Sequence, residues 1–244
     1  VVFGPLSRFI FLGFLVVLPM VAYSVDAARR FSAVIQDRVG PNRVGLPLTL
    51  LGFKKDVQLF GIGGLLQPLY MGCPSVLMQP VAFLQRPIRW LRAISKYRAC
   101  TSGGPNFAYD LCVDKIKPEQ REGLDLSCWE LACNGAEPVR AETIERFTRY
   151  FADYGFRRET FYPSFGLAEA TLIVTGGYKS EDPVVMDFDS RELEQGRAVP
   201  VAADHQWAQR MVSSGRPLLD QNVRIVDPEA LTVCEDGKVG EIWV

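Results

Sequence analysis

The chain begins with a long apolar stretch. Residues 9–25 form a run of 17 residues without a charged side chain, and Asp26, Arg29 and Arg30 follow directly. At about 1.5 Å per residue, a helix of this length lies at the lower limit of what crosses a hydrocarbon core of about 30 Å. The pattern favours a transmembrane helix whose Arg-rich end faces the cytoplasm. A buried helix of a soluble domain and a cleaved signal peptide are the alternatives.

A polar loop follows this apolar run, because glycine and proline interrupt residues 36–45. Together with the preceding apolar run and paired arginines, its string IQDRVGPNRVG resembles the first cytoplasmic loop of the H subunit of respiratory complex I (NADH-quinone oxidoreductase). In that family the subunit lies in the membrane and helps to form the quinone chamber. The resemblance covers residues 1–60, and Ala28 stands where the family usually has an acidic residue.

From residue 63 onward, apolar runs of strand and helix length alternate with Gly and Pro. Residues 74–78 predict a buried strand, residues 87–94 a helix opened by its proline, and residues 241–244 a further strand. Residues 139–151 carry apolar side chains at a helical period, with charged side chains on the opposite face. The alternation predicts an α/β domain.

Three glycine-containing segments lie between the predicted elements: residues 101–109 (TSGGPNFAY), 133–139 (CNGAEPV) and 162–171 (YPSFGLAEAT). Ligands of α/β sheets bind beyond the carboxyl ends of strands, so loops that follow strands are candidate walls of one site. Taken singly, each segment is more typical of an ordinary turn, and Glu169 of an acidic residue near a helix start.

Charge narrows the classes of function. The formal net charge is −1, so no general attraction to nucleic acid is expected. Residues 1–60 hold seven Lys or Arg and three Asp or Glu, whereas the remainder holds 20 and 25. This difference is typical of two segments with different origins.

The cysteines and the single histidine do not form a metal-binding pattern. No CxxC pair is present, and His205 has no cysteine near it, so a zinc site is not expected. We expect reduced thiols in a cytosolic setting and a His205 on the surface; any reaction that needs a histidine base would have to use it. The cysteines are Cys73, Cys100, Cys112, Cys128, Cys133 and Cys234.

In series, the strings of residues 63–244 resemble the fatty acyl-AMP ligases of the adenylate-forming superfamily, which supply polyketide and lipopeptide assembly lines. The resemblance rests on GGLLQPLYMG, PVAFLQRPIRWLRAISKYRA, TSGGPNFAYDLC, NGAEPV, FGLAEATL, SSGRPL, VRIVDPE and DGKVGEIWV, in the family's order and spacing. This resemblance implies an incomplete adenylate-forming, acyl-CoA synthetase-like N-terminal domain of α/β class over residues 63–244. The resemblance to the H subunit implies a membrane helix and loop before it, over residues 1–62.

The resemblance implies an adenine-binding role for two segments. Gly135, Ala136 and Glu137 would form a backbone wall beside the adenine, where a side chain on the glycine would block close approach. Phe165, followed by Gly166, would lie against the adenine ring. The family usually has Tyr in place of Phe165, and stacking survives the loss of the hydroxyl.

The resemblance also implies ATP and Mg²⁺ as cofactors and two catalytic residues. Glu169 would hold the Mg²⁺ that bridges the ATP phosphates, since a carboxylate is a hard ligand for a hard ion. Thr171 would lie near the α-phosphate. The implied partners are a fatty acid and an acyl carrier protein or a polyketide or peptide synthase. The implied channel for the fatty acyl group is lined by Ser102, Gly103, Gly104 and Phe107.

The implied reaction joins a fatty acid to ATP, giving acyl-AMP and pyrophosphate for lipid, polyketide or lipopeptide synthesis. Catalysis there is mostly positioning and neutralisation of phosphate charge, so no histidine base is needed. The family's phosphate loop, ribose-binding Asp and C-terminal lid are not found among the matching strings, and Val57 stands where the family has His. Each lost phosphate contact typically costs about 2.7–4 kcal/mol. We therefore expect an inactive fragment.

Three functional hypotheses remain open. The first is a cytoplasmic ligase fragment that folds around its sheet and binds a nucleotide weakly. The second is a membrane fragment of the H subunit, anchored through residues 9–25, with ligase sequence as a passenger; the third is a non-catalytic binding or scaffold piece. Both ends of the chain resemble cuts. Both parent families share similar strings around residues 63–69, so a recombination, a gene remnant, an assembly join and a functional fusion all remain possible origins.

Overall fold

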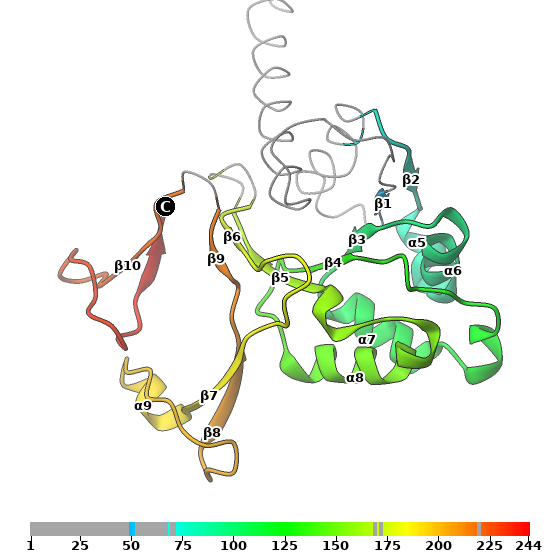
Figure 1. The fold of residues 1–244 in the computed structure, drawn as a ribbon. Helices are drawn as coiled ribbons and strands as arrows, with labels where there is room; N and C mark the ends of the chain where they lie inside the picture. Colours follow the sequence, from blue (N-terminus) through cyan, green and yellow to red (C-terminus); the bar gives the residue numbers. More distant parts are fainter. Residues whose placement is uncertain (1–48, 52–67, 69–71, 168–169, 171–172, 219–220) are drawn as a thin grey trace, which may run out of the picture.

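The computed structural model describes residues 49–51, 68, 72–167, 170, 173–218 and 221–244 (Figure 1). The transmembrane helix predicted for residues 9–25 lies outside these ranges, as does the polar loop after it. Within the ranges, every helix is too short or too polar to cross a bilayer.

The body of the described chain is built on a sheet in which five neighbouring strands run parallel. The strands lie in the order β2 (Ser75–Leu77), β1 (Thr49–Leu51), β3 (Thr101–Gly103), β4 (Leu131–Asn134), β5 (Phe161–Phe165), β6 (Thr175–Gly176) and β9 (Arg216–Pro217). From β2 to β5 each pair is parallel, and the last two pairs are antiparallel. The parallel strands with helices between them confirm the predicted α/β class.

Helices connect the parallel strands and gather on one side of them, below the sheet in Figure 1. They are α5 (Pro80–Gln85), α6 (Ile88–Tyr97), α7 (Asn106–Lys115) and α8 (Ala141–Phe151). A single turn of 3-10 helix, η3 (Pro118–Arg121), follows α7. Two more, η4 (Ala152–Tyr154) and η5 (Arg158–Thr160), follow α8. The unit β3-α7-β4-α8-β5 is therefore two consecutive parallel crossovers, and it brings successive loops to the same edge of the sheet.

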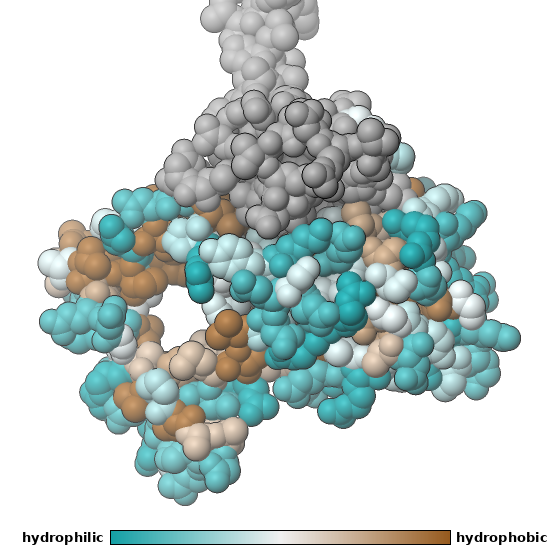
Figure 2. All heavy atoms as spheres, in the orientation of Figure 1, coloured by the Kyte–Doolittle hydropathy of each residue, from teal (hydrophilic) through white to brown (hydrophobic). Residues whose placement is uncertain are grey.

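Two antiparallel strand pairs lie beyond the main sheet. One joins β7 (Val185–Asp189) to β8 (Ala208–Val212), with α9 (Ser190–Glu194) directly after β7; the other joins β10 (Arg224–Val226) to β11 (Glu241–Trp243). The last strand confirms the one predicted at residues 241–244. Figure 2 shows apolar side chains exposed over this end of the molecule, whereas the surface on the helical side is mainly hydrophilic.

Aromatic rings fill the space between the helices and the sheet. The buried Trp129 ring lies 5.3 Å from Trp90 and 6.4 Å from Tyr109, measured between ring centroids. Both indole N–H groups are satisfied: Trp90 donates to Oγ of Ser102 and Trp129 to the carbonyl oxygen of Leu131, each at 2.9 Å. These bonds attach the aromatic core to β3 and β4.

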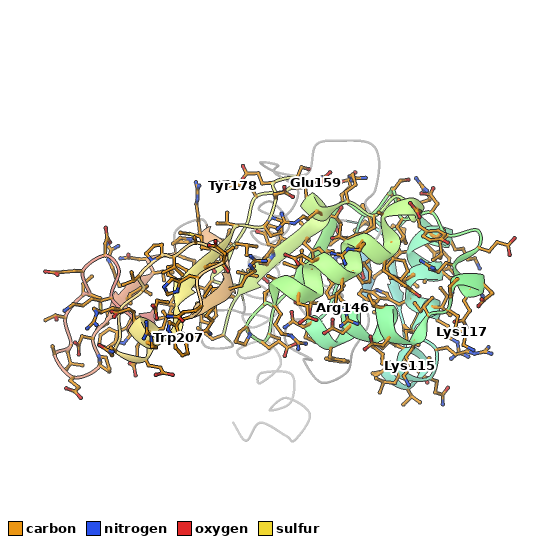
Figure 3. All side chains as sticks on the ribbon, turned by 90° about the horizontal axis from the view of Figure 1, so that it is seen from below. Lys115, Lys117, Arg146, Glu159, Tyr178 and Trp207 are labelled. Carbon is orange, nitrogen blue, oxygen red and sulfur yellow. The ribbon has the colours of Figure 1, made fainter. Side chains whose placement is uncertain are left out.

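The carboxylate of Asp110 joins α7 to α8. It is 17% exposed and accepts hydrogen bonds from Arg140 at 2.8 Å and from Thr143 at 3.1 Å. The guanidinium of Arg146, which Figure 3 shows on α8, reaches Asp110 at 3.5 Å and Asp114 at 2.6 Å. The two helices that flank β4 are thus held at a fixed spacing.

The predicted helices are confirmed with shifted ends. The helix predicted over residues 87–94 is α6, which begins after Pro87 as its N-cap and continues to Tyr97. The helix predicted over residues 139–151 is α8, which begins two residues later, after Arg140.

The strand predicted at residues 74–78 is β2, but the prediction that it is buried was wrong. Leu77 is 62% exposed. The reason is that β2 is the last strand at this end of the sheet that the described residues form, so it has a neighbouring strand on one side only.

The three glycine-containing segments contain more regular structure than predicted. Residues 101–103 are β3 and α7 begins at Asn106, so only Gly104 and Pro105 lie between them. The local composition predicted a turn here, but Gly103 is required by the packing of β3 against β4. A Cβ on it would lie 2.3 Å from the carbonyl oxygen of Cys133 on β4, and only glycine permits that approach.

Candidate functional site

The carboxyl ends of β3, β4 and β5 lie side by side. Gly103 pairs in register with Cys133, and Asn134 pairs with Pro163. The chain therefore leaves all three strands at one edge of the sheet, which confirms that the three glycine-containing segments converge. Ligands of parallel sheets bind at this edge, so it is the candidate site.

The loop after β4, residues 135–140, is shaped by two unusual positions. A Cβ on Gly135 would lie 2.8 Å from both the carbonyl oxygen and Oγ of Ser164 on β5, so packing alone requires glycine there. The next residue, Ala136, has a φ of +67°, in the left-handed region that side chains rarely adopt. Ala136 and Glu137 are exposed at the tip of this loop. The prediction that a side chain on Gly135 would block adenine stays a prediction, and Ser164 supplies a separate reason for the glycine.

The side chain of Asn106, fully buried at the start of α7, binds this loop. Its Nδ2 donates to the carbonyl oxygen of Pro138 at 2.9 Å. Its Oδ1 accepts from the backbone N–H of Arg140 at 3.0 Å and from Nδ2 of Asn134 at 3.3 Å. Sequence reasoning gave Asn106 no role, because no local pattern points to partners that lie 28, 32 and 34 residues away along the chain.

The carbonyl oxygen of Cys133 makes a second connection between the strand ends. It accepts from the backbone N–H of Gly104 at 3.0 Å and from the hydroxyl of Tyr109 at 2.8 Å. Burial raises the pKa of Tyr109 well above its ordinary value, so the phenol keeps its proton and donates it. Burial also raises the pKa of the Cys133 thiol, whose Sγ lies 3.4 Å from Oγ of Ser164. This side of the site is therefore neutral.

Three of the four predicted acyl-channel residues are buried and take part in the packing of the core. The hydroxyl of Ser102 accepts the indole N–H of Trp90, Gly103 lies against β4, and Gly104 is buried. Phe107, in the first turn of α7, is 46% exposed. The structure brings the four residues together at the end of β3, and their part in an acyl channel stays a prediction.

The predicted adenine-stacking residue, Phe165, ends β5 beside the loop after β4. Phe165 is partly exposed, its carbonyl oxygen accepts the N–H of Val174 at 2.9 Å, and Gly166 after it is exposed. Glu169 and Thr171 lie outside the described residues, so the predicted contacts to Mg²⁺ and to the α-phosphate stay predictions.

The described residues also form a hollow at the antiparallel end of the sheet. It lies between β5, β6 and the turns of residues 177–184 and 213–216, where the guanidinium of Arg216 stands 5.2 Å from the ring centroid of Tyr178. None of the predicted site residues that the structure describes lines it.

The reactive side chains noted in the sequence lie apart from the strand edge or are inert there. His205 is half-buried in the turn before β8, where its Nδ1 accepts the N–H of Trp207 at 3.2 Å and lies 3.9 Å from the carboxylate of Asp189. The six cysteines are free thiols in the structure, and a cytosolic, reducing setting stays a prediction.

A comparison with known families agrees with the geometry of the strand edge. A family model described as AMP-binding enzyme matches residues 57–244. The chain belongs to this family. The matched region begins upstream of the boundary predicted at residue 63 and includes Val57.

Several curated relatives of the chain are described as fatty acid ligases. A medium-chain fatty acid–acyl-carrier-protein ligase of Teredinibacter turnerae is 46% identical over 194 residues, covering 80% of this chain and 30% of that protein. The ligase of the same description from Moorena producens is 49% identical over 185 residues, covering 75% and 31%. The chain therefore spans about a third of the length of these relatives.

Solved structures show the same fold. The crystal structure of fatty acid AMP ligase from Legionella pneumophila gives a TM-score of 0.82 at 40% identity, covering 91% of this chain and 37% of that one. A fatty acyl-adenylate ligase of that species, in complex with acyl adenylate and pyrophosphate, gives 0.81. These relatives lend no support to the predicted resemblance of residues 1–60 to the H subunit.

Proposed function

We propose that residues 57–244 form the adenine side and the acyl entrance of an ATP-dependent fatty acid adenylating enzyme. The observation that carries the proposal is the shared edge of β3, β4 and β5, where the loop of residues 135–140, the partly exposed Phe165 and the exposed Phe107 come together. Relatives at 46% and 49% identity that are named as medium-chain fatty acid ligases support this choice of substrate class.

The side chains at this edge suit a flat, uncharged base. Phe165 is a partly exposed aromatic residue, and Ala136 and Glu137 are exposed in the loop beside it. An aromatic face and backbone groups are the contacts that adenine uses, so the described residues fit the base of ATP. The proposal that Mg²⁺ binds here is supported by residue type alone, because the carboxylate of Glu169 would supply a hard oxygen ligand.

The proposed reaction is acyl-adenylate formation. A carboxylate oxygen of the fatty acid attacks the α-phosphorus of ATP, the bond from that phosphorus to the bridging oxygen breaks, and pyrophosphate leaves with the electron pair. The reaction needs no proton acceptor, so the distance of His205 from the edge is no obstacle. Acyl transfer to an acyl carrier protein, the partner named for the relatives, and a cytoplasmic location belong to the same proposal.

Binding of an adenylate analogue tests the proposal without requiring turnover. Dodecanoyl-sulfamoyl adenosine mimics acyl-AMP, and isothermal titration calorimetry should show that the purified chain binds it and AMP. Phe165→Ala should weaken AMP binding by about 1–3 kcal/mol, since that is the usual worth of one base–aromatic contact. Phe165→Tyr should bind AMP at least as well as the wild type.

The control removes an exposed aromatic side chain elsewhere. Tyr97 closes α6 on the helical side and is 45% exposed. Tyr97→Ala should leave AMP binding unchanged. A folded wild-type chain that binds neither ligand, or equal losses in the Phe165 and Tyr97 variants, would overturn the proposed function.

A further inference from the structure

The loop after β4 holds a strained conformation that its own sequence does not favour. A left-handed conformation costs a non-glycine residue about 1–2 kcal/mol, and Ala136 adopts it with a φ of +67°. Such a conformation persists only where the surroundings over-determine it. Before Ala136 in the chain, Gly135 packs against Ser164. After Ala136, hydrogen bonds from the side chain of Asn106 hold Pro138 and Arg140.

We propose that Asn106 is a positioning residue that fixes the loop of residues 135–140 and links it to the turn before α7. In terms of the proposed function, on which this inference rests, it couples the acyl side of the site to the adenine side. Asn106 is adjacent in sequence to the exposed Phe107, so displacement of the first turn of α7 moves the groups that hold Pro138 and Arg140.

The chemistry of the contact explains why the residue is an asparagine. The site needs one N–H donor for the carbonyl oxygen of Pro138 and one oxygen that accepts twice, from Arg140 and from Asn134, on a short side chain. Only a carboxamide of this length supplies both. An Asp would keep the two acceptor bonds and lose the donor, and a Leu of similar size would lose all three.

The buried side chain of Asn134 depends on Asn106 for a hydrogen bond. It is fully buried on β4, its Nδ2 donates to Asn106, and its own Oδ1 has no hydrogen-bond partner among the described residues. Without Asn106, both ends of this second amide would be buried and unpaired, which is the expensive case for a polar group. The pair therefore acts as one unit beneath the loop.

Hydrogen exchange of the unliganded chain, followed by NMR and mass spectrometry, tests the positioning. Asn106→Leu should speed amide exchange across residues 136–140 by about tenfold or more, because the bonds that hold the loop are gone. Asn106→Asp should keep the N–H of Arg140 protected and loosen the segment around Pro138 only. This graded pattern is one that a loss of global stability would not produce.

A control on the same helix separates positioning from stability. Cys112 is fully buried on α7, and Cys112→Ala should lower the unfolding midpoint while exchange of the loop stays as in the wild type. Loop exchange in Asn106→Leu equal to that of the wild type would overturn the proposal. Should the Leu variant not fold, wild-type exchange around Pro138 in Asn106→Asp would overturn it equally.

Ligand binding forms the second arm of the experiment. AMP affinity should fall about tenfold in Asn106→Leu and stay within about twofold of the wild type in Cys112→Ala. Unchanged affinity in a variant with a loosened loop would overturn the coupling. A wild-type chain that binds no AMP would count against the proposed function, whereas the exchange pattern would still decide whether Asn106 positions the loop.

Discussion

At the scale of single residues, two neighbours in the loop after β4 are under opposite constraints. Gly135 has no room for a side chain because Ser164 lies against it, whereas Ala136 has a side chain in a backbone region that suits glycine. Substitutions at the two positions should therefore change stability in opposite directions.

Gly135→Ala should destabilise the chain by about 1–3 kcal/mol, the usual cost of overpacking. The new Cβ would meet the backbone oxygen of Ser164 at 2.8 Å, and a backbone atom in a sheet cannot turn away. Urea unfolding followed by tryptophan fluorescence measures the effect. Gly177→Ala is the control, because a Cβ there meets nothing within 4 Å; equal effects of both substitutions would contradict the packing argument.

Ala136→Gly should stabilise the chain by about 0.5 kcal/mol, since relief of left-handed strain exceeds the entropy that glycine adds to the unfolded state. The same urea titration measures it. Ala202, exposed and outside the left-handed region, is the matched position, and Ala202→Gly should destabilise instead. A loss of stability in both variants would mean that Ala136 is not strained.

At the scale of elements, the packing of β3 on the helices decides what its residues do. The hydroxyl of Ser102 accepts the buried indole N–H of Trp90, so the role of this serine is at least structural. The structure thus gives Ser102 a packing role that the sequence did not reveal, and its part in an acyl channel stays a prediction.

Ser102→Ala should cost about 1–3 kcal/mol of stability, because it leaves the Trp90 N–H buried without its acceptor. Thr148→Val is a matched loss of one hydroxyl, and it should be neutral or stabilising since the buried Thr148 hydroxyl has no partner in the part of the chain that the structure describes. The thermal unfolding midpoints of the two variants, each compared with the wild type, measure these effects. A stable Ser102→Ala variant with altered affinity for dodecanoyl-sulfamoyl adenosine would instead favour a hydroxyl in the acyl channel.

Local pattern predicted the elements whose signal is local. The apolar period of α8 and the proline before α6 were sufficient, and ordered strings identified the loops of the site. The start of α7 was missed because Gly103, Gly104 and Pro105 have the composition of a turn. Asn106 was missed because its partners stand 28, 32 and 34 residues away along the chain, a distance that no local window covers.

At the scale of the whole molecule, stability should depend on acid pH through Asp125. Hydrogen bonds from the hydroxyl and backbone N–H of Ser127, together with the guanidinium of Arg98, lower the pKa of Asp125 from 3.8 to about 2. A carboxylate with a lowered folded-state pKa stabilises the fold above its ordinary pKa, and this stabilisation is lost as pH falls from about 4 to about 2.

The thermal midpoint of the wild type should therefore fall more steeply across this pH window than that of Asp125→Asn. Some slope should remain in the variant, because backbone hydrogen bonds also lower the pKa of Asp227. Parallel curves for the two proteins between pH 4 and pH 2 would show that Asp125 does not contribute.

The chain of 244 residues should form no acyl-AMP by itself, since it spans about a third of the length of its ligase relatives. Preorganised phosphate contacts supply much of the rate of such reactions. Mass spectrometry after incubation with ATP, Mg²⁺ and dodecanoic acid provides the measurement. Detection of acyl-AMP above a boiled control would contradict the expectation.

The pairing of β6 with β9 has a consequence for engineering of the chain. Thr175 and Gly176 pair with Pro217 and Arg216, so the intervening segment, which includes β7, α9 and β8, leaves the sheet and returns to the place where it left. A chain excursion with adjacent ends tolerates added length, because each doubling of a loop costs only about 0.6 kcal/mol. The exposed turn at residues 202–204 is therefore where a fluorescent reporter or an affinity tag can be inserted while the strand edge of the site stays intact.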